Sequence, residues 1–93
     1  MSHKFLVHHI GDSVGVAIEE IAAGEQVQGV FLEDDSTILI KSNHHIPLGH
    51  KIALADITDN SKVIEYRVPI GIATEEISEG SYVHTHNLKT ARW

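Results

Sequence analysis

Histidine is the residue type that stands out in this chain, because eight histidines occur among 93 residues. Most fall into three groups, which are His8-His9, His44-His45 with nearby His50, and His84 with His86. Imidazole can bind a divalent metal or transfer a proton near neutral pH, so clustered histidines favour a site for one of these tasks. A structural or exposed role is the alternative, and it is the favoured interpretation for the loop pair His44-His45.

His84 and His86 are two residues apart in a stretch, residues 82–86, whose alternation is typical of a β-strand. On a strand both side chains would project from one face, which suits a pair of metal ligands. Asn87 would then point to the opposite face. A solvent-facing strand with polar side chains is the competing interpretation of the same pattern.

His50 and Asp12 directly follow glycines, where the backbone can approach a ligand closely. Lys51 is the next residue after His50. His50 follows Gly49, and its alternative role is that of a hydrogen-bonded turn residue. Lys51 could bind a substrate anion or lie solvated on a strand. Asp12 follows Gly11 and either caps a turn or contacts a ligand.

The composition argues against several classes of function. The formal net charge is −6 and the basic residues are scattered, which argues against nucleic-acid binding. There is no apolar run near the roughly 20 residues that span a bilayer, and the apolar run at residues 5–7 is too short for a secretory signal. Cysteine is absent, so disulfides and thiolate metal sites are excluded. Together these features predict a protein of the cytoplasm with no membrane partner.

The hydrophobic pattern predicts an all-β fold with short strands and little helix, in a single domain over residues 1–93. The expected strands cover residues 14–18, 27–32, 37–40, 51–54, 68–73 and 82–86. A hairpin turn is expected at residues 33–36. Residues 17–23 could hold one helical turn before Gly24 ends it.

A seven-residue motif recurs four times and predicts one type of tight turn. It consists of an aliphatic residue, two residues, Gly or Asn, two more residues and a second aliphatic residue. The copies are residues 21–27, 46–52, 57–63 and 77–83. Gly and Asn best tolerate positive φ, so each copy is expected to turn the chain between two aliphatic anchors. The uneven spacing of the copies argues against a solenoid.

These turns resemble those of SAF-type β-clip domains, and most closely the N-terminal domain of the altronate and galactarate dehydratases. The resemblance is carried by residues 11–17 (GDSVGVA), 46–54 (IPLGHKIAL), Tyr66 with 69–71 (PIG), and 80–88 (GSYVHTHNL). It implies a compact β-clip domain. One departure is Ser13, where the dehydratase domains often carry Asn, and this mildly favours a different substrate.

A free-standing chain of this kind is similar to the alpha subunits of (2R)-3-sulfolactate sulfo-lyases, which eliminate sulfite from 3-sulfolactate to leave pyruvate. The resemblance implies the small subunit of a metal-dependent lyase, inactive without a large catalytic subunit. The implied cofactor is a divalent metal, Fe(II) first, with Mn(II) or Zn(II) as alternatives. Two other functions stay open: part of an altronate or galactarate-type dehydratase, and a non-catalytic ligand-binding module.

Under this interpretation the marked residues are expected to serve three roles. The roles are catalytic for His50, Lys51 and His86, metal-binding for His84 and His86, and substrate-binding for Asp12, Ser13 and Asn87.

The C-terminal residues 88–93 are expected to contact the large subunit. Trp93 is the single tryptophan of the chain and lies near Lys89 and Arg92. A terminal aromatic residue of this kind suits an interface anchor, and a frayed tail is the alternative.

Overall fold

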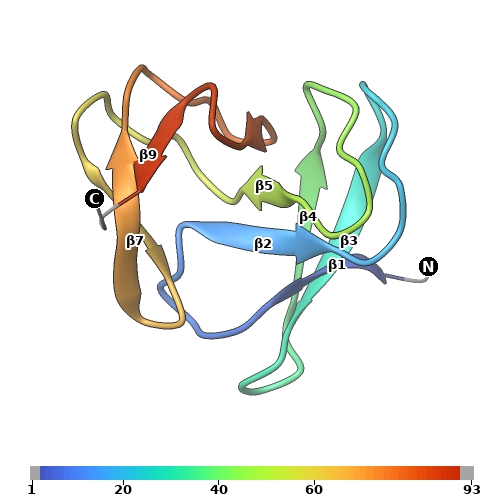
Figure 1. Ribbon diagram of the computed structural model, residues 1–93. Helices are drawn as coiled ribbons and strands as arrows, with labels where there is room; N and C mark the ends of the chain where they lie inside the picture. The colour runs from blue at the N-terminus through green and yellow to red at the C-terminus, as the bar shows by residue number, and fades with distance from the viewer. Residues whose placement is uncertain (1–2, 91–93) are drawn as a thin grey trace.

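The computed structural model describes residues 3–90, and within them every regular element is a β-strand (Figure 1). The strands are β1 His3–Val7, β2 Val14–Ala17, β3 Gln26–Phe31, β4 Thr37–Lys41, β5 Lys51–Ala53, β6 Lys62–Glu65, β7 Val68–Ala73, β8 Tyr82–Val83 and β9 Leu88–Thr90. The predicted all-β β-clip fold with little helix is confirmed.

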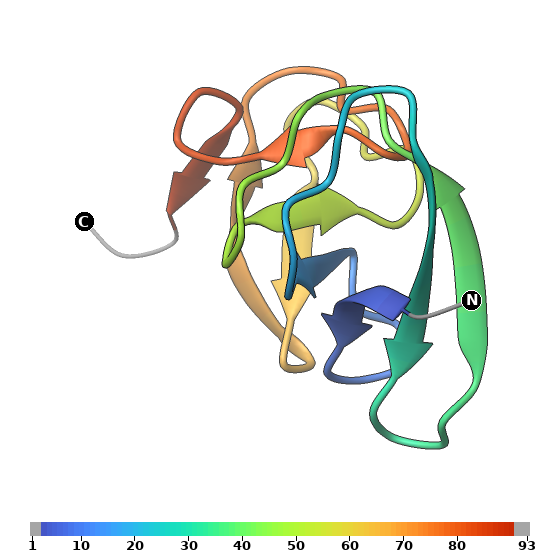
Figure 2. The ribbon, with the colours of Figure 1, turned by 90° about the vertical axis from the view of Figure 1, so that its right-hand side faces the viewer.

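The strands form two sheets. The larger has six strands in the order β4-β3-β1-β2-β5-β8, and the smaller has three in the order β6-β7-β9. Only β1 and β3 pair in parallel among the described strands. Figures 1 and 2 show the β3–β4 hairpin at one end of the molecule and the three-stranded sheet at the other, with β2 and β5 between them.

The four copies of the seven-residue motif form two pairs of turns. Ile21 and Ile46 exchange backbone hydrogen bonds in the first pair, and Ile57 and Ile77 do so in the second. The central residue of each copy has a φ between 73° and 86°, as the motif predicts, at Gly24, Gly49, Asn60 and Gly80.

The bonding within each pair is reciprocal. In the first pair the central N–H groups cross over, with Gly24 donating to the Ser42 carbonyl and Gly49 donating to the Ala17 carbonyl, both at 2.8 Å. The second pair repeats this crossing in its own two turns. The motif is therefore one turn type used four times, and not a coincidence of sequence.

Each pair of turns builds its own hydrophobic core, because the aliphatic anchors of the motif are all buried. The first core consists of Phe5, Val7, Ala17, Ile21, Val27, Ile40, Ile46, Ile52 and Leu54. The second consists of Val14, Ala53, Ile57, Val63, Ala73, Ile77 and Val83. The anchors of the first two turns lie in the first core, and those of the last two turns lie in the second.

Most of the predicted strands occur. Five agree with observed strands to within one residue, namely β2, β3, β4, β5 and β7, and the expected hairpin turn joins β3 to β4. The hydrophobic pattern does not predict β1, β6 or β9. The possible helical turn at residues 17–23 is wrong, because Ile21 forms a β-bridge there.

Two further expectations concern a membrane-spanning segment and the C-terminal residues 88–93. Within residues 3–90, no helix is long and apolar enough to cross a membrane. Of the predicted partner contact at residues 88–93, the structure describes Leu88–Thr90 as β9, and the remainder lies outside the described residues.

Candidate functional site

Three of the predicted site histidines gather around Tyr82. The Tyr82 hydroxyl and His50 Nδ1 share a hydrogen bond of 2.7 Å, and His84 stacks on the Tyr82 ring with 5.5 Å between ring centroids. The His50 and His84 centroids are 4.9 Å apart, and His86 lies 5.6 Å from Tyr82. Tyr82 of β8 pairs with Ile52 of β5, which brings the C-terminal histidines beside the second turn. The His50 and His84 rings are therefore neighbours.

The prediction that His84 and His86 share one strand face is wrong. The two histidines lie in a tight turn after β8, closed by the Asn87 N–H donating to the His84 carbonyl at 3.1 Å. The Asn87 side chain fixes this turn, since its Oδ1 accepts from the His84 N–H at 2.9 Å and its Nδ2 donates to the Tyr82 carbonyl at 2.8 Å. Asparagine favours turns because its side chain can bond nearby backbone groups in this way.

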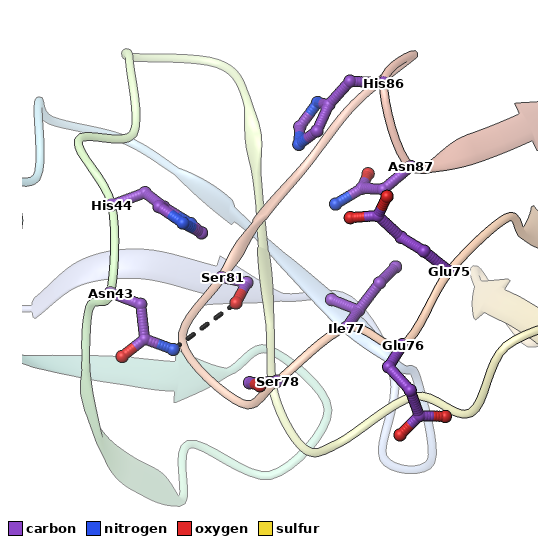
Figure 3. Close-up of a pocket in the computed structure, with 9 residues that line it drawn as sticks. All are labelled: Asn43, His44, Glu75, Glu76, Ile77, Ser78, Ser81, His86 and Asn87. Carbon is purple, nitrogen blue, oxygen red and sulfur yellow. Dashed lines mark hydrogen bonds between the residues drawn. The ribbon is translucent and has the colours of Figure 1, made fainter.

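His86 also lines a surface cleft of about 360 Å³ (Figure 3). The lining residues are Asn43, His44, Glu75, Glu76, Ile77, Ser78, Ser81, His86 and Asn87. Figure 3 shows the rings of His44 and His86 directed into the same space from opposite sides, with Glu75 directed inward beside Asn87. Two imidazoles and a carboxylate around one cleft can exchange protons with a bound ligand.

Two cleft residues were not among the predicted site residues, namely Glu75, which the sequence does not mark, and His44, for which a structural or exposed role was favoured. Each lies two positions before the first aliphatic anchor of a turn, at Ile46 and at Ile77, so the motif contains the signal that relates them. His44 is also held in place, because its Nδ1 accepts a hydrogen bond of 3.2 Å from the Tyr82 N–H. The cleft therefore adds a fourth histidine to the three around Tyr82.

Asp12 supports the β6–β7 hairpin. Its buried carboxylate accepts hydrogen bonds from the backbone N–H groups of Tyr66 and Arg67, both at 3.1 Å, and from that of His9 at 3.2 Å. Tyr66 and Arg67 both have positive φ, a conformation that costs non-glycine residues about 1–3 kcal/mol each. These hydrogen bonds stabilise the strained turn, and substrate contact by Asp12 stays a prediction.

Ser13 and Asn87, the other predicted substrate ligands, also bond to the backbone. The Ser13 hydroxyl accepts from the Ile64 N–H at 3.0 Å, and the Ser13 N–H donates to the Ile64 carbonyl at 2.8 Å. Asn87 is buried and its amide closes the histidine turn described above. The structure shows what these side chains hold in place, and their contact with a substrate stays a prediction.

Glu33 ties the β3–β4 turn to the same loops. It accepts a hydrogen bond of 3.0 Å from the Ile10 N–H and pairs with the Arg67 guanidinium. The Ile10 hydrogen bond, supported by the charge of Arg67, holds the pKa of Glu33 below its usual value. Glu33 is therefore an ionised counterion for Arg67 at neutral pH.

Lys51 lies near β6, whereas its neighbour His50 bonds to Tyr82 of β8. Its Nζ lies 3.9 Å from the Glu65 carboxylate at the end of β6. The structure thus divides the predicted residues into two groups. His50, His84, His86 and Asn87 lie around Tyr82 and the cleft, whereas Asp12, Ser13 and Lys51 contact β6 or the turn that follows it.

Residues 3–90 do not supply a complete set of ligands for the predicted metal. Within residues 3–90, no group of three or more His, Asp or Glu side chains could hold a metal ion. Protein metal centres of the zinc type use at least three protein ligands. A divalent metal at His84 and His86 therefore stays a prediction that requires ligands from another chain.

The all-β architecture fits a SAF-type β-clip domain, and a sequence comparison identifies the family. The family model of the altronate/galactarate dehydratase SAF domain matches residues 3–91. Because the match covers nearly the whole chain, the chain belongs to this family.

Two kinds of relative share the domain. The (2R)-sulfolactate sulfo-lyase subunit alpha of Chromohalobacter salexigens is 40% identical, with both chains covered in full. The subunit alpha of Paracoccus pantotrophus is 39% identical over 69% of this chain and 96% of its own. The altronate dehydratase of Escherichia coli is 36% identical over 94% of this chain but only 16% of its own length. The same domain thus occurs as a short subunit and as a small part of a longer dehydratase.

Proposed function

We propose that this chain is the small subunit of a two-subunit lyase. Together with a large catalytic subunit, it would release sulfite from (2R)-3-sulfolactate. The observation that carries the proposal is 40% identity along the full length of a sulfolactate sulfo-lyase subunit alpha. The open cleft beside the histidine turn supports it, since His44, His86 and Glu75 supply proton-transferring groups at a surface that a second chain can cover.

The reaction is an elimination. A base removes the proton on C2, the electrons of that bond form the C2–C3 double bond, and the C3–S bond breaks as sulfite departs. The enol that remains takes up a proton on C3 and releases its hydroxyl proton, which gives pyruvate. Among the residues of this chain, His86 is the proposed proton-transfer group, because its ring projects into the cleft. His50 holds the Tyr82 hydroxyl, and Tyr82 in turn supports the rings of His84 and His86.

As the alternative to proton transfer by His86, we propose that His84 and His86 contribute to a divalent metal site shared with the large subunit. Imidazole and carboxylate ligands suit Fe(II), Mn(II) and Zn(II), and such a metal would polarise the substrate carboxylate and hydroxyl. Weak metal binding by this chain alone is expected, because two histidines leave most coordination positions unfilled.

The chain alone should release no sulfite from 3-sulfolactate, and addition of the large subunit should restore release. The physical reason is that an open cleft of about 360 Å³ cannot exclude water from a small acid. Sulfite and pyruvate are both measured, with and without the large subunit. Turnover by the small chain alone would contradict the two-subunit proposal.

A sugar-acid dehydratase is the second candidate, because the matching family model bears that description and the E. coli altronate dehydratase is 36% identical over 94% of this chain. The assembled protein is therefore also given altronate and galactarate. Formation of a keto acid from either substrate, without sulfite release from 3-sulfolactate, would favour the dehydratase.

Deletion of Thr90–Trp93 should weaken association with the large subunit, since the single tryptophan of an acidic chain is expected to anchor the interface. Co-purification with a tagged large subunit measures the effect, and Trp93→Ala separates the aromatic ring from the length of the tail. Unchanged recovery of both variants would show that the tail is not part of the interface.

A further inference from the structure

Glu65 is a buried carboxylate that the proposed reaction does not yet use. Its side chain is 6% exposed at the end of β6. Within residues 3–90, the carboxylate has two polar neighbours. Its Oε1 lies 3.9 Å from Lys51 Nζ, and its Oε2 lies 3.8 Å from His8 Nε2. Both distances exceed a hydrogen bond. A buried carboxylate is costly unless it is closely paired, so this loose arrangement calls for an explanation.

The three side chains come from three separate segments. His8 follows β1 and Lys51 begins β5, both in the six-stranded sheet, whereas Glu65 ends β6 in the three-stranded sheet. Apolar residues of similar size would usually join two sheets at least as stably as a buried charge does. Stability alone therefore does not account for a carboxylate at this junction.

The Lys51 and His8 side chains are partly exposed to solvent, and the Glu65 side chain is nearly covered. The side chains of Lys51 and His8 are 32% and 24% exposed, near a carboxylate that is almost covered. The His8 ring also stacks on the Tyr66 ring, with 4.2 Å between centroids. Tyr66 itself is held in its positive-φ turn by Asp12. The Lys51 ammonium and the His8 ring are thus partly exposed to solvent, whereas the Glu65 carboxylate that lies near both is almost covered.

We propose that Glu65 is a positioning residue that holds the Lys51 ammonium and the His8 ring toward an acid group of the substrate. The ligand class is a small hydroxy acid that carries a carboxylate or a sulfonate. This inference rests on the proposed lyase function and adds His8 and Glu65 to the residues that serve it. Glu65 acts through Lys51, because its carboxylate is too deeply covered to meet the substrate.

The test is a double-mutant cycle of Glu65→Gln and Lys51→Met in the assembled enzyme. Each single substitution should raise the KM for 3-sulfolactate about tenfold, because a lost ground-state ionic contact weakens binding more than it slows chemistry. The double variant should have a KM below the product of the two single effects, since only the His8 ring is then left for Glu65 to position. Steady-state sulfite release provides both KM and kcat.

A matched control exists in the half-buried pair of Lys4 and Glu25, whose side chains are 2.7 Å apart. Glu25→Gln and Lys4→Met should leave KM unchanged. A normal KM in Glu65→Gln, or effects of Glu65→Gln and Lys51→Met that simply multiply, would overturn the positioning role. If Glu65→Gln fails to fold, Lys51→Met and His8→Ala still decide the matter, and a normal KM in both overturns the proposal.

Failure of the proposed function has a different signature. It would be seen as no sulfite release by the unaltered assembly. Binding of 3-sulfolactate is then followed by NMR shifts of the Lys51 and His8 side chains. If 3-sulfolactate causes no shift of these signals, the positioning role is overturned. If it causes shifts in the unaltered protein but not in the Glu65→Gln variant, the role is supported.

Discussion

Replacement of His86 by alanine should reduce sulfite release by the assembled enzyme about a hundredfold or more, as loss of a metal ligand or proton-transfer group does. His86 is exposed in its turn and projects into the cleft, so its removal leaves no hole in either core. The fold and the subunit association should therefore be unchanged. The measurements are kcat at saturating 3-sulfolactate, thermal unfolding of the chain and co-purification with the large subunit.

His45 provides the matched control for this experiment. It follows the cleft residue His44, but its own ring pairs with Glu20 on the neighbouring turn. His45→Ala should therefore leave turnover near normal. His84→Ala should behave like His86→Ala, because His84 stacks on the same Tyr82 ring. Near-normal turnover in both the His84→Ala and His86→Ala enzymes would mean that these histidines are surface residues without a role in the reaction.

Gly80→Ala should destabilise the chain by about 4 kcal/mol or more, which is a large part of the 5–15 kcal/mol typical of a domain. Gly80 has a φ of 86°, and a Cβ there would lie 2.1 Å from the Lys41 carbonyl oxygen. That oxygen belongs to the backbone and cannot move aside cheaply. Urea unfolding followed by circular dichroism measures the loss.

Gly24→Ala separates the two causes of this effect. Gly24 has nearly the same backbone conformation, with a φ of 83°, but a Cβ there would meet nothing within 4 Å. Only the conformational cost of about 1–3 kcal/mol applies. Equal loss in the two variants would show that the close approach of the fourth turn to β4 contributes nothing.

The turns were the most predictable part of this molecule. Gly24, Gly49, Asn60 and Gly80 can be identified because a positive φ restricts the choice of residue, and that restriction is written locally in the sequence. Burial of the aliphatic anchors follows from the same motif. In contrast, the pairing of the first turn with the second, and of the third with the fourth, depends on contacts between distant segments that no local pattern reveals.

The site was predictable as a set of residues but not as an arrangement. Alternation at residues 82–86 predicts a strand, yet the Asn87 side chain closes a turn there and redirects His84 and His86. His44 and Glu75 enter the cleft only because separate turns approach one another. Glu65 gives no signal in its own strand, since its partners come from segments far away in sequence. Local chemistry identifies candidates, and only the tertiary fold assigns their neighbours.

The two cores are also separated along the chain, and this matters while the protein is being synthesised. Every buried member of the first core lies between Phe5 and Leu54, whereas the second core draws on residues 53–83 together with Val14. Chains emerge from the ribosome N-terminus first and tend to fold in that order. The first pair of turns therefore has all its buried partners before β6 has been made. The growing chain need not expose its first apolar core while it waits for the later segments that carry Glu65 and the C-terminal histidines.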